Sequence, residues 1–557
     1  MSPEQIRPIL FLALAFVGML LWQAWQQDYG QNEPEPISNL GPDGPSVPGV
    51  DRATSPALDV PQAPNVEGVD TAVGDGPATN QVASSAGIDV VTDIYRVRIN
   101  LVGGTLANVD LLQYPVSLEE PNTPFPLLVD RGSKLFMAQS GLVGKSNAPN
   151  HYAPYTATKD YYELDDRDEE LTVNLTWRGE GVTVTKRYVF KRDNYVIDVI
   201  HEVQNDTSQP WTGGAYGQFR RIAPNESRGL GTIYTYTGGV VSSPDKPYEK
   251  YDFSDMEDQD LNLDIRGGWI AMIQHYFAGA WIPPAQEEYN FYSKAPSSSQ
   301  FVLGMVEPGF SVAPGTRGQT AMQLYLGPKV QSRLMEAAPG LERTVDYGWL
   351  FFIAEPLYVS LQFIQGILTN WGWSIIVLTM FIKLLFYPLS NASYKSMARM
   401  RKLQPKMATL KERFGDDRQK LNQAMMEMYK KEKINPLGGC LPIVVQIPVF
   451  ISLYWVLLET VELRQAPFMF WLKDLSTHDP FYVLPVLMGI SMFAQQRLSP
   501  APPDPIQAKV MMAMPVIFTF FFLFFPSGLV LYWLCNNLLS ITQQYYITRR
   551  IESGKIK

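Results

Sequence analysis

The distribution of hydrophobic residues divides the chain into unlike regions, and the first is an apolar segment near the N-terminus. Residues 6–25 are long enough to cross a bilayer as a helix. A cleaved signal peptide is the alternative, but Trp22, Gln23 and Trp25 stand where small residues would precede a cleavage site. We therefore expect residues 1–26 to form an uncleaved transmembrane anchor.

The next region is rich in proline and glycine. Between residues 27 and 90, Arg52 is the only basic residue, and stretches such as EPEP and GPDGPSVPG cannot bury enough apolar surface to fold. We expect residues 27–90 to be a flexible linker that separates the anchor from the rest of the chain.

Alternation of apolar and polar residues then predicts β-strands. Such alternation runs through residues 95–101 and 171–177, and period two is typical of half-buried strands. Further candidate strands lie at residues 182–190, 195–203, 231–236 and 320–326. Residues 91–340 are therefore predicted to form one large, mostly antiparallel β-sandwich domain.

Long apolar segments dominate the last third of the chain. Residues 349–368 are interrupted by Glu355 and Pro356, so this segment could span the membrane or lie along its surface as an amphipathic helix. The better candidates for transmembrane helices are residues 371–389, 441–461, 481–496, 510–525 and 527–546. With the anchor they give six spans, so the chain is predicted to be a multi-domain membrane protein with an all-α polytopic core.

Charge predicts the orientation of these spans. The overall net charge of −9 is uninformative, but residues 390–439 carry twelve lysines and arginines against five acids, and the tail after residue 548 is also basic. By the positive-inside rule, both segments lie in the cytoplasm, as does the N-terminus. The β-domain then lies outside, and its lack of cysteine fits a bacterial periplasm. We expect a multi-pass inner-membrane protein with a cytoplasmic tail at residues 551–557.

The basic loop has a helical period of its own. Its apolar residues, many of them methionines, recur at three- and four-residue steps on both sides of the turn FGDD, which predicts an amphipathic helical hairpin over residues 390–434. One interpretation is two helices packed on each other near anionic lipid heads, and the other is a cytosolic platform for partners or nascent chains. The residues singled out are Met397, Arg399, Met400, Arg401, Lys402, Met407 and Met425.

Lys383 is the most informative residue, because it is the only charged side chain well inside any predicted span. A cation near a helix centre costs about 2.5–3.5 kcal/mol on insertion scales, so it must face protein or water. The alternative is that it snorkels toward the inner end of its helix at Leu389, roughly 9 Å away at helical rise. Polar residues of its own and other spans favour a hydrated cavity, whose predicted polar members are Thr379, Gln446, Ser452, Thr519, Asn536, Asn537 and Gln543. Its predicted aromatic walls are Phe450, Phe521, Tyr532 and Trp533.

Several long motifs of the last third resemble the YidC/Oxa/Alb family of membrane protein insertases. They are NWGWSIIVLTMFIKLLFYPLSNASYKSMARMRKLQPKM, NPLGGCLPIVVQIPVF, VELRQAPF and MPVIFTFFFLFFPSGLVLYWLCNN, within residues 346–550. The anchor and the large exported domain resemble the Gram-negative bacterial form of the family.

The resemblance implies an architecture and a set of site residues. The β-domain would be a supersandwich, residues 341–369 would hold an interfacial helix, and residues 370–550 would be a five-helix insertase core around a hydrophilic groove. The groove charge of the family maps onto Lys383, where arginine is usual, so the charge is kept and the bidentate fork is lost. Thr379 maps to a polar groove position, residues 441–461 and 510–525 map to substrate-sliding helices, and Tyr532–Trp533 map to an aromatic pair.

The resemblance also implies the function: an insertase and chaperone that moves nascent membrane proteins from the cytosol into the inner membrane, alone or with the Sec translocon, and assists their folding. Its partners would be nascent membrane proteins, Sec components, the ribosome and the phospholipid bilayer. No enzyme activity, cofactor, metal site or nucleic-acid site is expected. The alternative is a transporter or channel with a periplasmic ligand-binding domain, but neither a through-pathway nor internal repeats are evident. The segment GLVGKS lacks the first glycine of a phosphate-binding loop, since position 139 is Gln139.

Overall fold

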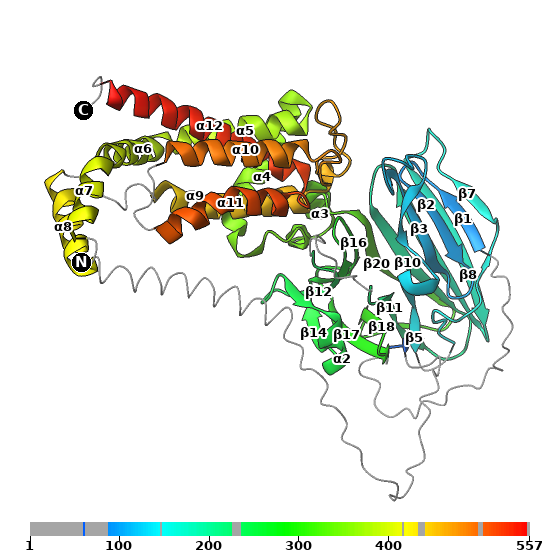
Figure 1. The fold of residues 1–557 in the computed structure, drawn as a ribbon. Coiled ribbons are helices and arrows are strands. Elements are labelled where there is room, and N and C mark those ends of the chain that lie inside the picture. Colours follow the sequence, from blue (N-terminus) through cyan, green and yellow to red (C-terminus); the bar gives the residue numbers. More distant parts are fainter. Residues whose placement is uncertain are drawn as a thin grey trace, which may run out of the picture. The chain divides into compact units, whose positions relative to one another are not determined.

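A computed structural model describes residues 59–61, 87–144, 147–224, 235–414, 417–432, 441–499 and 505–553. All of them belong to one compact unit, Pro56–Lys557. The predicted anchor, almost all of the predicted linker and the last residues of the tail lie outside the described residues. Along the described chain a β-rich part precedes a helical part, which confirms the predicted fold class (Figure 1).

Within the described residues, twenty strands form two sheets. The first sheet has the order β14 (Asn262–Arg266), β17 (Glu288–Ser297), β18 (Gln300–Val306), β11 (Trp211–Ile222), β5 (Phe136–Gly144), β3 (Thr105–Pro115), β2 (Tyr95–Asn100), β1 (Gly87–Val91) and β7 (Tyr161–Glu163), with β19 (Phe310–Val312) beside β11 and β4 (Pro124–Leu128) beside β3. The second has the order β13 (Glu249–Tyr251), β12 (Gly238–Ser242), β15 (Trp269–Ile273), β16 (Phe277–Ile282), β20 (Thr316–Pro328), β10 (Val196–Asn205), β9 (Val182–Lys191), β8 (Glu170–Gly179) and β6 (Thr156–Ala157). All pairings are antiparallel except β1 with β7.

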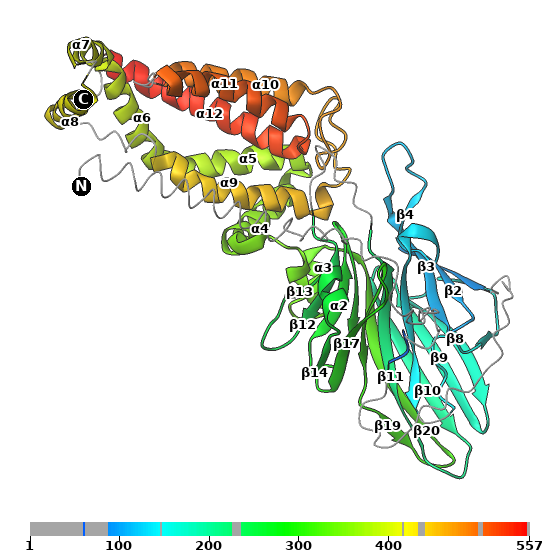
Figure 2. The same ribbon diagram turned by 60° about the horizontal axis from the view of Figure 1, so that its bottom comes forward.

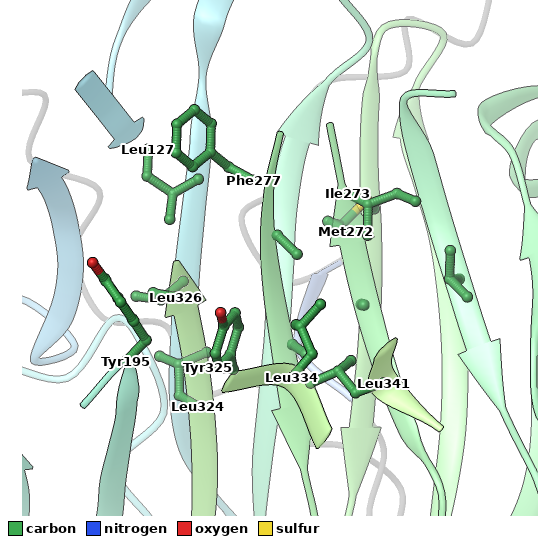
Figure 3. Close-up of a cluster of buried hydrophobic side chains, with 14 of the residues drawn as sticks. Leu127, Tyr195, Met272, Ile273, Phe277, Leu324, Tyr325, Leu326, Leu334 and Leu341 are labelled. Atoms are coloured by element: carbon green, nitrogen blue, oxygen red, sulfur yellow. The ribbon is translucent and has the colours of Figure 1, made fainter. Parts of the chain in front are cut away.

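The two sheets pack face to face because alternate residues of their strands are apolar. The rings of Phe219 on β11 and Trp281 on β16 lie 6.1 Å apart across the interface. Gly217 allows this approach, since a Cβ there would lie 2.6 Å from the Trp281 ring. Figure 3 shows part of this core, where Phe277 and Leu324 point toward the same interior. A short helix, α3 (Gln331–Ala337), closes one end with Leu334.

The strand predictions agree with the structure at several positions and differ at others. Residues 182–190 lie in β9, and 320–326 lie in β20. The predicted strand at 231–236 is wrong for its two described residues, because Thr235 and Tyr236 lie outside any strand. The rest of that prediction lies outside the described residues. The first strand begins at Gly87, four residues before the predicted boundary.

The helical part contains α4 (Phe351–Leu368), α5 (Trp371–Leu385), α6 (Tyr387–Lys402), α7 (Gln404–Phe414), α8 (Arg418–Lys431), α9 (Leu441–Glu459), α10 (Val483–Leu498), α11 (Pro505–Phe522) and α12 (Ser527–Glu552). Between α4 and α5 the backbone of Thr369 is left-handed, with φ of 53°, and the Asn370 side chain then caps α5 by accepting from the backbone N–H of Trp373 at 3.1 Å.

The predicted span at 371–389 is broken. Helix α5 ends at Leu385, and α6 leaves it at an angle of 68°. Pro388 in the first turn of α6 favours this break, because proline is tolerated there and disfavours helical continuation. The predicted hairpin, residues 390–434, also differs from the structure. It contains parts of three helices, α6, α7 and α8, because α6 and α7 separate at Leu403.

The lengths of the helices bear on the number of spans. Among the residues the model describes, the helical segment Gly348–Leu368 is by itself long and apolar enough to cross a membrane. The bent α5–α6 pair would add a second span if it is counted as one. The six spans therefore stay a prediction from the sequence.

Candidate functional site

A cavity of about 640 Å³ lies among the helices and has Lys383 in its wall. Residues of α5, α6, α9, α10, α11 and α12 line it, and Figure 2 shows how these helices are arranged. Its polar lining residues are Lys383, Ser390, Ser393, Gln446, Gln495, Gln496, Ser499, Asn536, Asn537, Ser540 and Gln544. Its apolar and aromatic lining residues are Tyr394, Met397, Met400, Ile447, Phe450, Met492, Met511, Met514, Pro515, Tyr532 and Trp533.

The ammonium group of Lys383 takes part in a chain of polar contacts across the cavity wall. It donates to Ser540 Oγ at 2.8 Å and to Gln446 Oε1 at 3.5 Å. Gln446 in turn donates through Nε2 to Asn536 Oδ1 at 2.6 Å. The Lys383 side chain thus points at α9 and α12, which argues against snorkelling toward the end of its own helix.

Lys383 lacks a salt bridge to any side chain in the described part of the chain, since no carboxylate there lies within 4.0 Å of Nζ. Among the described residues, its partners are two neutral oxygens. A buried cation held only by neutral acceptors can still attract an anion strongly, because charges interact strongly where the dielectric is low.

Aromatic rings form the wall next to this polar chain. Phe450 on α9 meets Trp533 on α12 edge to face at 4.3 Å and lies 6.1 Å from the ring of Tyr532. Phe522 of α11 lies 5.2 Å from Trp533. Such packing fixes the rings by contact area and by favourable edge-to-face geometry. In the described part of the cavity wall, a cation and several amides therefore lie next to packed aromatic rings.

The structure brings together only part of the predicted set. Asn537 lines the cavity and donates to Ser491 Oγ at 3.0 Å. Thr379 does not line it: the residue is 1% exposed, and its hydroxyl donates to the Ile375 carbonyl at 2.6 Å. Its role as a groove residue stays a prediction.

Two predicted residues of α11 also lie away from the cavity. Thr519 donates to the Pro515 carbonyl at 2.7 Å and packs against Gly489 of α10. Phe521 is 53% exposed, and its ring packs on Phe525 at 4.7 Å. Neither belongs to the lining residues.

Sequence reasoning missed Ser540, which makes the shortest contact to Lys383. A signal was present: Trp533, Asn537, Ser540 and Gln544 recur at steps of four, three and four, which places them on one face of α12. The sequence-based choice was Gln543, one position away from that face. The serines of α6 were missed because the break after α5 was not foreseen.

The methionines of the basic loop lie at two places, the wall of the cavity and a cluster between the hairpin helices. Met397 and Met400 line the cavity, and Met400 also joins Met407 and Met425 around buried Leu403 and Tyr429. This second cluster agrees with the interpretation that the hairpin helices pack on each other. Arg399, Arg401 and Lys402 are exposed, and the Lys402 ammonium donates to the Ile551 carbonyl at 2.9 Å.

Within the described ranges, no group of three or more His, Cys, Asp or Glu side chains could hold a metal ion.

Two family models match successive parts of the chain. The model for the YidC periplasmic domain matches residues 87–360, and the model described as 60Kd inner membrane protein matches residues 363–554. Their boundary falls within α4. The first match spans the β-domain, and the second contains every helix that contributes to the cavity.

Curated relatives match almost the whole chain. A membrane protein insertase YidC of Nitrosococcus oceani is 50% identical over 557 residues, and one of Methylococcus capsulatus is 51% identical over 554 residues. Each alignment covers 99% of both chains. Among solved structures, an active YidC insertase with its first transmembrane domain resolved is 19% identical, with a TM-score of 0.39, and the match covers 84% of this chain and 93% of that one.

Proposed function

Because the chain belongs to the YidC family of membrane protein insertases, we propose that it takes polar segments of client membrane proteins into the cavity around Lys383. The protein is an insertase and not an enzyme. A client's polar segment enters the cavity from the cytosol, while its apolar helix moves along α9 and α11 into lipid. Transfer of the apolar helix into the bilayer then drives release of the polar segment on the far side.

One observation carries this proposal: Lys383 lies in a cavity lined by both polar and apolar side chains and, among the described residues, has only neutral acceptors. A buried charge that is held by hydroxyl and amide oxygens lowers the cost of bringing a client carboxylate into the membrane. Acidic segments are therefore the clients that gain most. Phe450 and Trp533 supply the adjoining surface for apolar parts of the client.

The orientation and the other partners complete the proposal. Both termini lie in the cytoplasm and the β-domain in the periplasm, as the distribution of basic residues indicates. The exposed basic residues of α6, Arg399, Arg401 and Lys402, face the ribosome or anionic lipid heads. Insertion proceeds alone or with the Sec translocon.

Depletion of the protein and rescue with Lys383 variants tests the electrostatic part. Lys383→Arg keeps the charge and retains insertion, whereas Lys383→Glu lowers insertion of acidic-tailed clients by roughly tenfold, equivalent to about 1.4 kcal/mol. The readout is protease accessibility of a radiolabelled client in membrane vesicles.

The matched control is Lys473→Glu, which reverses the charge of an exposed lysine outside the cavity and leaves insertion unchanged. Normal insertion of acidic-tailed clients by the Lys383→Glu protein would show that the charge of this residue plays no part.

A further inference from the structure

Residues Asp59, Val60 and Pro61 lie within the stretch predicted to be a flexible linker, yet they are packed on the β-domain. Asp59 is 4% exposed, and Pro61 is buried. The segment contacts residues from the loop after β5 and from β11, β17 and β18 (Figure 1). A residue of a proline-rich tether that is almost fully buried needs a specific partner.

The carboxylate of Asp59 has three polar partners. The Tyr152 hydroxyl contacts Oδ1 at 2.7 Å and Oδ2 at 2.9 Å. His151 Nε2 and the Arg220 guanidinium each lie 3.4 Å from Oδ2. Burial raises the pKa of Asp59, but His151, Tyr152 and Arg220 outweigh that effect, so the pKa is lowered from its usual 3.8.

The Tyr216 hydroxyl holds His151 in place beside Asp59. The His151 backbone N–H donates to the Tyr216 hydroxyl at 2.9 Å, and His151 Nδ1 lies 2.5 Å from the same oxygen. These contacts hold the ring so that Nε2 faces Asp59 Oδ2, 3.4 Å away.

The residue after Asp59 covers an apolar patch on the outer face of the first sheet. Strand alternation places Tyr216 and Arg220 on the face opposite Phe219, which enters the sandwich core. Tyr216, Tyr292, Val302, Val306 and Val143 form a separate buried cluster there, and Val60 packs against it. Lys294 donates to the Val60 carbonyl at 2.8 Å. The β-domain thus contacts the backbone carbonyl of Val60, the side chain of Val60 and the carboxylate of Asp59.

We propose that the β-domain has a carboxylate-binding docking site for the chain's own linker, and that docking at Asp59 shortens the tether between the predicted anchor and the domain. Position 26, where the predicted anchor ends, is 33 residues from Asp59 and 61 residues from Gly87. At full extension these lengths reach about 115 Å and about 215 Å. Docking therefore nearly halves the distance that the β-domain can reach from the anchor.

Cysteine accessibility in the full-length protein tests the docking. Pro61→Cys is introduced with Cys440→Ser and Cys535→Ser, and its alkylation by a maleimide is timed in lipid nanodiscs. Docking keeps this reaction at least about tenfold slower than in urea, and Asp59→Asn removes most of that protection, since it deletes the recognised charge. Tyr152→Phe removes one donor from the receptor side and gives a partial increase.

Asp70→Asn is the matched control, because it makes the same change in the same predicted linker and leaves the rate slow. Unchanged thermal unfolding of each variant shows that the β-domain stays folded. Rapid alkylation of the introduced thiol in the protein that keeps Asp59, or equal acceleration by Asp70→Asn, would overturn the proposal.

A distance measurement adds an independent readout. The distance is measured between spin labels at Ser55→Cys and Arg131→Cys. Residue 55 is four positions from Asp59 and hence within about 14 Å of it, and Arg131 is an exposed residue of the β-domain. Docking gives a narrow distance distribution that broadens in Asp59→Asn. A broad distribution in both proteins would also contradict docking.

Discussion

Lys186 is fully buried between the two sheets of the β-domain. Its ammonium donates to the Ser140 carbonyl at 2.9 Å and to the Gly103 carbonyl at 3.0 Å. The ring centroids of Tyr188 and Tyr155 lie 5.4 Å and 5.9 Å from its nitrogen. Burial holds the pKa of Lys186 well below its usual 10.5.

This pKa makes the stability of the β-domain depend on pH. Between the lowered folded pKa and 10.5 the unfolded chain binds more protons than the folded chain, so the free energy of unfolding rises with pH by up to about 1.4 kcal/mol per unit. Lys186→Met removes this slope. Thermal unfolding of the full-length protein between pH 7 and pH 9 measures it.

The pH range and the control variant separate the contribution of Lys186 to this slope from that of other groups. Burial and nearby Lys186 keep the pKa of His201 well below 6.5, so this histidine stays neutral there. Burial raises the pKa of Tyr155 and of Tyr188 in the folded chain, and the ordinary tyrosine pKa of about 10 keeps both protonated in the unfolded chain up to pH 9, so neither contributes to the slope there. Lys191→Met changes a half-exposed lysine on the same sheet and keeps the slope. A slope that persists in Lys186→Met would assign it to another group.

At the scale of elements, the close packing of α10 on α11 depends on one glycine. A Cβ at Gly489 would overlap the Thr519 hydroxyl and would lie 3.1 Å from Thr519 Cβ. Small residues at such contacts let helix backbones approach closely in membranes. The missing side chain at Gly489 therefore positions α11, which carries Met511 and Met514 into the cavity wall.

Gly489→Ala is expected to destabilise the helical part by about 1–3 kcal/mol, because the added methyl group forces the two helices apart. Thr519→Ala in the same chain removes the overlapping hydroxyl and recovers part of the loss. Thermal unfolding in detergent measures both. Gly366→Ala is the control, since a Cβ there meets nothing within 4 Å. Equal destabilisation by the two glycine variants would refute the packing argument.

The elements themselves were largely predictable, and their breaks were not. The alternation in 182–190 and the apolar run in 441–461 predict β9 and α9 because periodicity and length are local properties. The apolar run at 371–389 continues past Leu385, so hydropathy carries no sign of the 68° turn, although Pro388 favours a break there. Ser540 and Asp59 were missed for another reason: their partners, Lys383 and His151, are distant in sequence.

At the scale of the whole molecule, a buried ion pair joins the end of the β-domain to the last residue of α9. Lys329 Nζ lies 2.8 Å from Glu459 Oε2, and both side chains are less than 5% exposed. Lys329 also donates to the Thr344 carbonyl at 3.2 Å. The same helix carries Gln446 and Phe450 in the cavity wall, so one rigid element contacts both the β-domain and the cavity.

Breaking this pair from one side is expected to cost about 3–5 kcal/mol, because the remaining charge is buried without a partner. Lys329→Met alone should therefore lower the thermal unfolding temperature far more than the double variant Lys329→Met/Glu459→Leu. The matched control is a double-mutant cycle on the exposed pair of Arg98 and Asp89. The coupling free energy between these two residues is expected to be about 1 kcal/mol or less. Similar coupling in both cycles would contradict the buried-pair interpretation.

The break between α5 and α6 makes α6 a lever arm. The arm has 16 residues and is therefore about 24 Å long. It carries Ser390, Ser393 and Met397 along one side of the cavity, while its pivot at Phe386 lies three residues after Lys383. A change of about 10° in the angle between the two helices moves the far end of the arm by about 4 Å at this length. The distance from Met400 to the facing wall of the cavity can thus vary by the size of a side chain while the lysine stays almost still.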